Sequence, residues 1–205
     1  MENFSMDGIF DQYIKKPNIF SNKNILTTRF TPDNVPHRDE QIKQIALMIA
    51  PTLRNEKPSN IFIYGKTGTG KTLVIKKIIS QLMKTAGEKV GIKIIYINCK
   101  MQKISDTEYR LVAQLISEFG ESVPYTGLPT NELYKKLFNY LNRENKNIIL
   151  ILDEIDSLIN KIGDEVLYTL TRINQDLEKT NLTLIGISNN LSFIETLDPR
   201  VRSSL

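Results

Sequence analysis

The stretch Gly65-Lys66-Thr67-Gly68-Thr69-Gly70-Lys71-Thr72 has the spacing G-x-x-x-x-G-K-[ST], which is the pattern of a phosphate-binding loop. Its glycines lack Cβ atoms, so the loop is able to turn back and present its backbone amides to an anion. Those amides and the N-terminus of a following helix supply partial positive charge. We expect Lys71 to reach the β- and γ-phosphates and the Thr72 hydroxyl to ligate Mg²⁺. The whole stretch therefore predicts a site for a purine nucleoside triphosphate with magnesium.

Strands and helices alternate around this loop. Ile61-Phe62-Ile63-Tyr64 is typical of a short buried strand, and apolar residues recur at helical spacing from Leu73 to Met83. Further strands are expected over 93–98, 148–152 and 182–188. Further helices are expected over 39–53, from a capping box at 105–108 to Phe119, through 133–141 and over 165–177. This order predicts an α/β fold with a mainly parallel sheet and helices on both faces, while 1–36, 121–129 and 197–205 show no regular pattern.

Polar residues follow two of the apolar strands, at the edge of the sheet where ligands of parallel α/β proteins bind. Asp153 is expected to hold Mg²⁺ through water, and Glu154 to polarise an attacking water. Two carboxylates at a strand end, taken alone, are more typical of solvated side chains; with the phosphate loop upstream, they indicate hydrolysis. The position of Asn189 fits equally well an amide that orients the water and a turn asparagine.

The composition of the chain limits which classes of protein it can belong to. The chain has 205 residues, a formal net charge of +4 and one cysteine, Cys99, so it has no internal disulfide. The positive balance permits contact with nucleic acid, but solvated lysine-rich helices give the same balance. The sequence shows neither a signal peptide nor an apolar run near the roughly 20 residues of a membrane helix. We therefore expect a cytoplasmic protein without a membrane partner.

Together these residues resemble the AAA+ ATPases and, within them, the archaeal initiator family, homologues of the origin recognition complex and its cell-division-cycle loading partner. The resemblance begins near Phe30. It is carried by the stretches FTPDNVPHRDEQI, YGKTGTGKT, YINCKMQKISDTEYRL, VPYTGLPTNELY, ILILDEID, IGISNNL and LDPRVRSSL. It implies a three-layer αβα P-loop NTPase core that binds ATP or ADP with Mg²⁺. It also implies an N-terminal extension over 1–36, partly lining the purine, and an incomplete AAA+ domain over 37–205.

The resemblance also implies roles for single residues. Lys71, Glu154 and Asn189 become catalytic, with Asn189 as the sensor-1 residue, and Thr72 and Asp153 become the magnesium residues. The segment Val35-Pro36-His37-Arg38 resembles the stretch that lines the purine, although His37 on sequence alone is an ordinary surface histidine.

An insert of about residues 100–120 resembles the initiator-specific motif, which in the family touches the DNA duplex. Lys100, Lys103 and Arg110 are its candidate phosphate contacts, and each taken singly fits a solvated helix face equally well. The implied partners are double-stranded origin DNA, the replicative helicase and other initiator subunits, which places the protein at the nucleoid.

The chain departs from the wider family in two respects. Ser204 stands where many AAA+ proteins have an arginine finger, and neither Arg200 nor Arg202 is assigned that role from the sequence. The resemblance also implies that the fifth strand, the helical lid and the winged-helix domain are lacking, which would leave the edge of the loop strand unpaired.

We therefore expect an ATP-binding replication initiator that recognises origins and helps load the helicase, with weak ATPase activity in this form. Two alternatives stay open. One is a nucleotide-gated switch that binds DNA or a partner with little hydrolysis. The other is a clamp-loader-like AAA+ ATPase, against which the insert argues.

Overall fold

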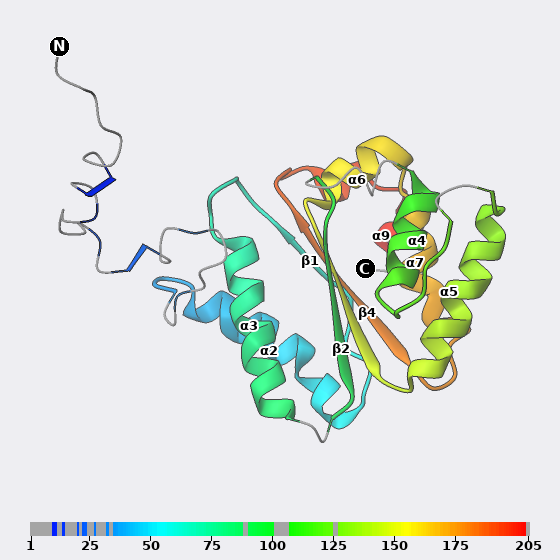
Figure 1. The fold of residues 1–205 in the computed structure, drawn as a ribbon, viewed down its shortest axis with the longest axis horizontal. Helices are drawn as coiled ribbons and strands as arrows, with labels where there is room; N and C mark the ends of the chain where they lie inside the picture. Colours follow the sequence, from blue (N-terminus) through cyan, green and yellow to red (C-terminus); the bar gives the residue numbers. More distant parts are fainter. Residues whose placement is uncertain are drawn as a thin grey trace, which may run out of the picture. The chain divides into compact units, whose positions relative to one another are not determined.

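The computed structural model describes residues 10, 11, 14, 20, 22, 23, 27, 32, 35–87, 90–100, 107–124 and 127–203. The chain divides into two units, Met1–Asn34 and Val35–Leu205. The second unit holds the phosphate-binding loop and the described sheet (Figure 1).

Within the described residues, the sheet has four parallel strands in the order β1-β4-β3-β2. They are β1 (Ile61–Tyr64), β2 (Ile92–Asn98), β3 (Asn147–Asp153) and β4 (Asn181–Ser188). The four strands expected from the sequence and their parallel arrangement are confirmed. All four carboxyl ends therefore meet at one edge of the sheet, the edge that carries the phosphate-binding loop.

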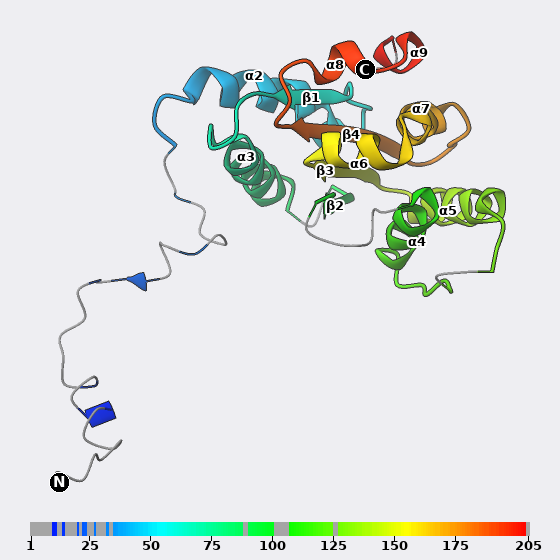
Figure 2. The same ribbon diagram turned by 90° about the horizontal axis from the view of Figure 1, so that it is seen from above.

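Helices cover both faces of the sheet, as the three-layer prediction requires (Figure 2). One face packs against α2 (Asp39–Ile49), the 3₁₀ turn η2 (Ala50–Arg54) and α3 (Lys71–Ala86). The other face packs against α4 (Glu108–Ser117), α5 (Thr130–Glu144), α6 (Ile155–Ile162), α7 (Glu165–Arg172), the turn η4 (Ile173–Gln175), α8 (Phe193–Thr196) and α9 (Pro199–Arg202). None of the described helices is long and apolar enough to cross a membrane.

The alternation of side chains along the strands decides which residues reach the loop. In β3, Ile148, Leu150 and Leu152 belong to the core on the α4–α9 face, whereas Ile149 and Ile151 belong to the core under α2 and α3. Because successive side chains of a strand point to opposite faces, Asp153 follows Ile151 onto the α3 face.

Three expectations need correction. A helix, α6, begins directly after the acidic pair where none was expected. The segment 197–205 is not wholly irregular, because the Asp198 side chain caps α9 by accepting from Arg200 N. The helix expected from a capping box at 105–108 begins at Glu108, capped by Thr107; residues 101–106 lie outside the described residues.

The helices expected over 39–53 and 165–177 are also shorter as α-helices. α2 ends at Ile49 and continues as the 3₁₀ turn η2, because Pro51 has no backbone N–H to donate. α7 ends at Arg172 and continues as η4.

Candidate nucleotide site

The phosphate-binding loop joins β1 to α3 at the carboxyl edge of the sheet. Gly68 and Gly70 have φ angles of 80° and 83°, in the left-handed region that favours glycine. Gly70 is also the N-cap residue of α3, so the unpaired amides of the first helical turn open onto the loop. A Cβ atom at either glycine would meet no heavy atom within 4 Å. The loop therefore borders open space, as a cradle for a phosphate requires.

The Lys71 side chain links the loop to Asn189, the residue directly after β4. Its ammonium donates to the Gly65 carbonyl at 2.8 Å, the Lys66 carbonyl at 3.0 Å and Asn189 Oδ1 at 2.8 Å. Burial lowers the pKa of Lys71, and nearby carboxylates, that of Asp153 foremost, act in the opposite direction. The cation is thus held at the loop by weak acceptors that an anionic phosphate would outcompete.

The Asp153 carboxylate is buried and accepts from three donors, one in α3, one in β2 and the backbone amide of Glu154. Oδ2 accepts from the Thr72 hydroxyl at 2.8 Å and from the Tyr96 hydroxyl at 2.6 Å, and Oδ1 accepts from Glu154 N at 2.9 Å. Carboxylate and hydroxyl oxygens are the ligands that Mg²⁺ prefers. Thr72 and Asp153 therefore lie where the sequence predicts a magnesium site, and their chemistry fits the ion.

Glu154 and Asn189 lie on the same edge. Glu154 adopts a left-handed φ of 55°, which is uncommon for a residue with a side chain. Its Oε1 lies 3.5 Å from Asn189 Nδ2, so the two groups are close without a tight bond. The structure thus brings Lys71, Thr72, Asp153, Glu154 and Asn189 together from three separate stretches of sequence.

Sequence reasoning missed two residues of this site, Tyr96 and Asp156. Asp156 Oδ1 accepts from the Ser188 hydroxyl at 3.0 Å and from Asn189 N at 3.2 Å, which anchors the end of β4 to α6. Burial raises the pKa of the Tyr96 hydroxyl, and its hydrogen bond to Asp153 adds to the rise. Tyr96 lies two residues before the end of an expected strand, a position that placed it on one of the two faces but did not show which.

A cavity of about 250 Å³ lies beside the loop. It is lined by Arg38, Gln41, Ile45, Ile63, Tyr64, Gly65, Thr69, Lys71 and Val74. Of the four residues expected to line the purine, Arg38 borders this cavity and donates to the Thr69 carbonyl at 3.0 Å. Val35 packs into the core beneath α2 and α3, whereas Pro36 and His37 are exposed. The purine contacts of these four residues stay a prediction.

Two of the three candidate DNA contacts can be placed. Lys100 and Arg110 are exposed on either side of residues 101–106, and Lys103 lies outside the described residues. The Lys100 backbone amide donates to Asn98 Oδ1 at 3.0 Å, which fixes the chain as it leaves β2.

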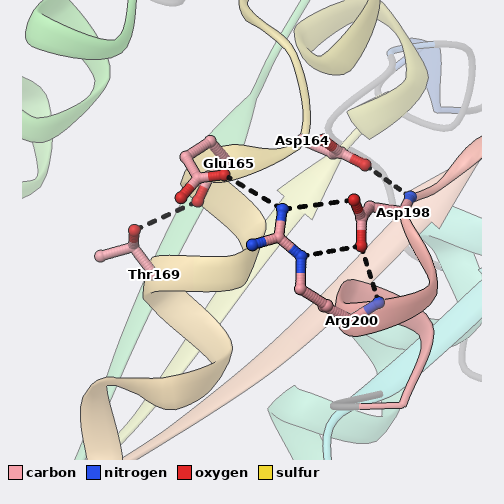
Figure 3. Close-up of polar contacts among 5 residues, drawn as sticks. All are labelled: Asp164, Glu165, Thr169, Asp198 and Arg200. Atoms are coloured by element: carbon pink, nitrogen blue, oxygen red, sulfur yellow. Dashed lines mark hydrogen bonds and ion pairs between the residues drawn. The ribbon is translucent and has the colours of Figure 1, made fainter.

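Arg200 is engaged by carboxylates of its own chain (Figure 3). Its guanidinium donates to Asp198 at 3.1 and 3.3 Å and lies 4.0 Å from Glu165. Asp198 N donates to Asp164 Oδ2 at 2.7 Å, and the Arg200 guanidinium also lies 5.2 Å from the centre of the Tyr168 ring. These contacts fasten α9 to α7.

Comparisons with known proteins agree with this geometry. The family model described as "AAA domain" matches residues 54–194. The ORC1-type DNA replication protein of Pyrococcus abyssi is 46% identical, with an alignment that spans 100% of this chain and 49% of the relative. ORC1-type DNA replication protein 1 of Archaeoglobus fulgidus is 47% identical, over 97% of this chain and 48% of the relative. The chain thus spans about half the length of the curated relatives it matches.

The fold has a solved counterpart in the Aeropyrum pernix ORC1 protein, whose structure is in complex with DNA. That protein is 41% identical, with a TM-score of 0.81, and the match covers 90% of this chain and 47% of that one. Cdc6p from Pyrobaculum aerophilum, at 21% identity and a TM-score of 0.71, shares the fold over 89% of this chain and 47% of its own.

Proposed function

Since the chain belongs to the AAA domain family and, within it, to the archaeal ORC1-type DNA replication proteins, we propose that it is the ATP-binding part of a replication initiator. The observation that carries the proposal is the meeting of Lys71, Thr72, Asp153, Glu154 and Asn189 at one edge of the sheet. This arrangement has a cation for phosphate, hard oxygen ligands for Mg²⁺, and a carboxylate beside an amide for water.

The residues act as follows in this proposal. The loop amides and Lys71 bind the β- and γ-phosphates, and Lys71 exchanges carbonyl and amide acceptors for phosphate oxygens. Thr72 and Asp153 hold Mg²⁺, which supplies positive charge against the phosphate oxygens. Glu154 polarises a water, and Asn189 orients that water while remaining within reach of Lys71. The purine occupies the cavity beside the loop, between the apolar side chains of Ile45, Ile63 and Val74.

Duplex DNA is the proposed macromolecular partner. The charge balance of the chain is positive, Lys100 and Arg110 are exposed at the insert, and the related Aeropyrum protein is in complex with DNA. Phosphate contacts of this kind give salt-dependent affinity with little reading of base sequence. Origin recognition, helicase loading, contacts with other initiator subunits and a nucleoid-associated location in the cytoplasm are the wider parts of the proposal.

Hydrolysis can be tested by replacing the proposed general base. Glu154→Gln should bind ATP with nearly wild-type affinity, because the uncharged amide is nearly isosteric, and should lower turnover by about 100-fold or more. Glu195→Gln, an exposed residue of α8, serves as the matched control and should keep wild-type turnover. Equal and near-zero turnover in the wild type and in Glu154→Gln would favour the nucleotide-gated switch instead.

Origin recognition needs its own test, made on the protein as its gene encodes it. Binding to tiled chromosomal duplexes should exceed binding to shuffled duplexes of the same composition at matched salt, by about 10³-fold for a specific site. Equal affinity for both sets would refute origin recognition while leaving the ATP site untouched.

A further inference from the structure

We propose that Tyr96 is a positioning residue for magnesium binding, because its hydroxyl fixes the Asp153 carboxylate oxygen that also contacts Thr72. The inference rests on the proposed nucleotide site and deepens it. Tyr96 belongs neither to the phosphate-binding loop nor to the acidic strand end, and it reaches the site from β2.

The register of the sheet explains how Tyr96 reaches Asp153. Asn98 pairs with Asp153 and Tyr96 pairs with Ile151, so Tyr96 lies two residues before Asp153 on the neighbouring strand and on the same face. Its side chain spans that offset along the strand direction, and its hydroxyl donates to Oδ2 at 2.6 Å. This is the length of a hydrogen bond from a hydroxyl to an ionised carboxylate.

The surroundings of Tyr96 argue against a purely structural role. Tyr96 is 39% exposed and belongs to neither hydrophobic core, so its side chain contributes little to the packing of the sheet. The hydroxyl nevertheless points to a buried carboxylate. The Lys76 ammonium lies 5.4 Å from the centre of the Tyr96 ring. The bond to Asp153 is therefore the hydrogen bond that directs the Tyr96 hydroxyl into the site.

The bond matters because Thr72 and Tyr96 share one acceptor atom. Thr72 donates to Oδ2 at 2.8 Å, and its oxygen is also the expected magnesium ligand. Glu154 N holds Oδ1, so the Tyr96 bond completes the set of donors that fixes the plane of the carboxylate. Without the Tyr96 hydroxyl, Oδ2 of Asp153 would keep only the hydrogen bond from Thr72 among these three donors, and the carboxylate could rotate more easily. Removing a hydrogen bond to a metal-binding carboxylate typically weakens metal binding by about 10- to 100-fold.

The test is Tyr96→Phe, which removes the hydroxyl and keeps the ring. A fluorescent ATP analogue is titrated at fixed Mg²⁺ concentrations and again in EDTA, and Mg²⁺ is titrated at fixed nucleotide. We expect the Mg²⁺ concentration that gives half of the maximal increase in nucleotide affinity to rise about 10-fold. Nucleotide affinity in EDTA should stay within about twofold of wild type, since the loop amides and Lys71 are unchanged. Tyr140→Phe, on α5 across the sheet, is the matched control and should behave as wild type.

Two results would overturn the inference. Unchanged Mg²⁺ dependence in Tyr96→Phe would show that the hydroxyl does not position Asp153. Equal loss of nucleotide affinity with Mg²⁺ and in EDTA would assign Tyr96 to the general structure of the pocket. In that case the melting temperature without nucleotide would also fall. Failure of the proposed function looks different, because the wild type itself would then bind no nucleotide under either condition.

Discussion

Gly186 in β4 lies directly beside Phe62 in β1, and the two residues are partners in the strand register. A Cβ atom at Gly186 would lie 2.6 Å from Phe62 Cε1, closer than real Cβ contacts come. The Phe62 ring in turn stacks on Phe193 of α8, with ring centroids 6.3 Å apart. The absent side chain at Gly186 therefore leaves room for the Phe62 ring where β1 pairs with β4.

Gly186→Ala should lower the free energy of unfolding by about 1–3 kcal/mol, because the added methyl group forces the Phe62 ring to move. Urea denaturation followed by circular dichroism measures the loss. A double-mutant cycle with Phe62→Leu is the control, since the smaller side chain leaves room for the methyl group. If the two changes were simply additive, the contact with Phe62 would not be the cause.

At the same residue scale, the polar residues at the strand ends could be predicted and their outer partners could not. Asp153, Glu154 and Asn189 each follow an apolar strand, and parallel strands bring those ends to one edge. Tyr96 and Asp156 act through the direction in which a side chain leans, and that direction depends on the strand register and on α6. The register that brings Tyr96 beside Asp153 is not visible in the spacing of residues along the chain.

At the scale of elements, the strands were predicted more accurately than the short helices. An apolar strand is recognised by its composition. By contrast, α6 follows β3 directly, with Glu154 in the left-handed conformation as its N-cap residue and no loop sequence between the two elements. The apolar residues Ile155, Leu158, Ile159 and Ile162 do have helical spacing, and this signal could have revealed α6. The four-residue helix α9 is too short for periodicity and depends on its cap at Asp198.

The contacts in Figure 3 predict that α9 is held in place by Asp164. Asp164→Ala removes the acceptor of the Asp198 N–H, so hydrogen exchange in peptides covering 197–203 should become several-fold faster. Mass spectrometry of exchange measures this directly. Asp176→Ala, an exposed carboxylate after α7, is the control and should leave the same peptides unchanged. Wild-type exchange at 197–203 in Asp164→Ala would mean that the burial of Leu197 and Val201 suffices to hold the segment.

At the scale of the whole molecule, the chain corresponds to about half the length of its curated relatives. The strand order places β1 at one edge of the described sheet. The expectation that a further strand pairs beside β1 in the family stays a prediction. The sequence resemblance to the archaeal initiators is confirmed by the ORC1-type relatives, which are 46% and 47% identical over 100% and 97% of this chain.

The proposed DNA contacts in the insert predict how the affinity for DNA depends on salt concentration. If Lys100 and Arg110 contact DNA phosphates, replacing each with alanine should reduce the slope of log affinity against log salt by about 0.9. Fluorescence polarisation with a duplex of mixed sequence, over a series of KCl concentrations, measures the slope. Lys84→Ala, in the last turn of α3, is the matched loss of one charge away from the insert. An equal change in slope for all three variants would mean that net charge acts without a defined contact.

The central claim is that the loop from Gly65 to Thr72 binds ATP with magnesium, and the affinity of Lys71→Ala for ATP tests it most directly. Equilibrium binding of a fluorescent ATP analogue in excess Mg²⁺ should show saturable binding by the wild type and by Lys84→Ala. Lys71→Ala should bind roughly 10- to 100-fold more weakly, because it loses a charge-assisted hydrogen bond to phosphate. An affinity of Lys71→Ala equal to that of the wild type would contradict the assignment of the site.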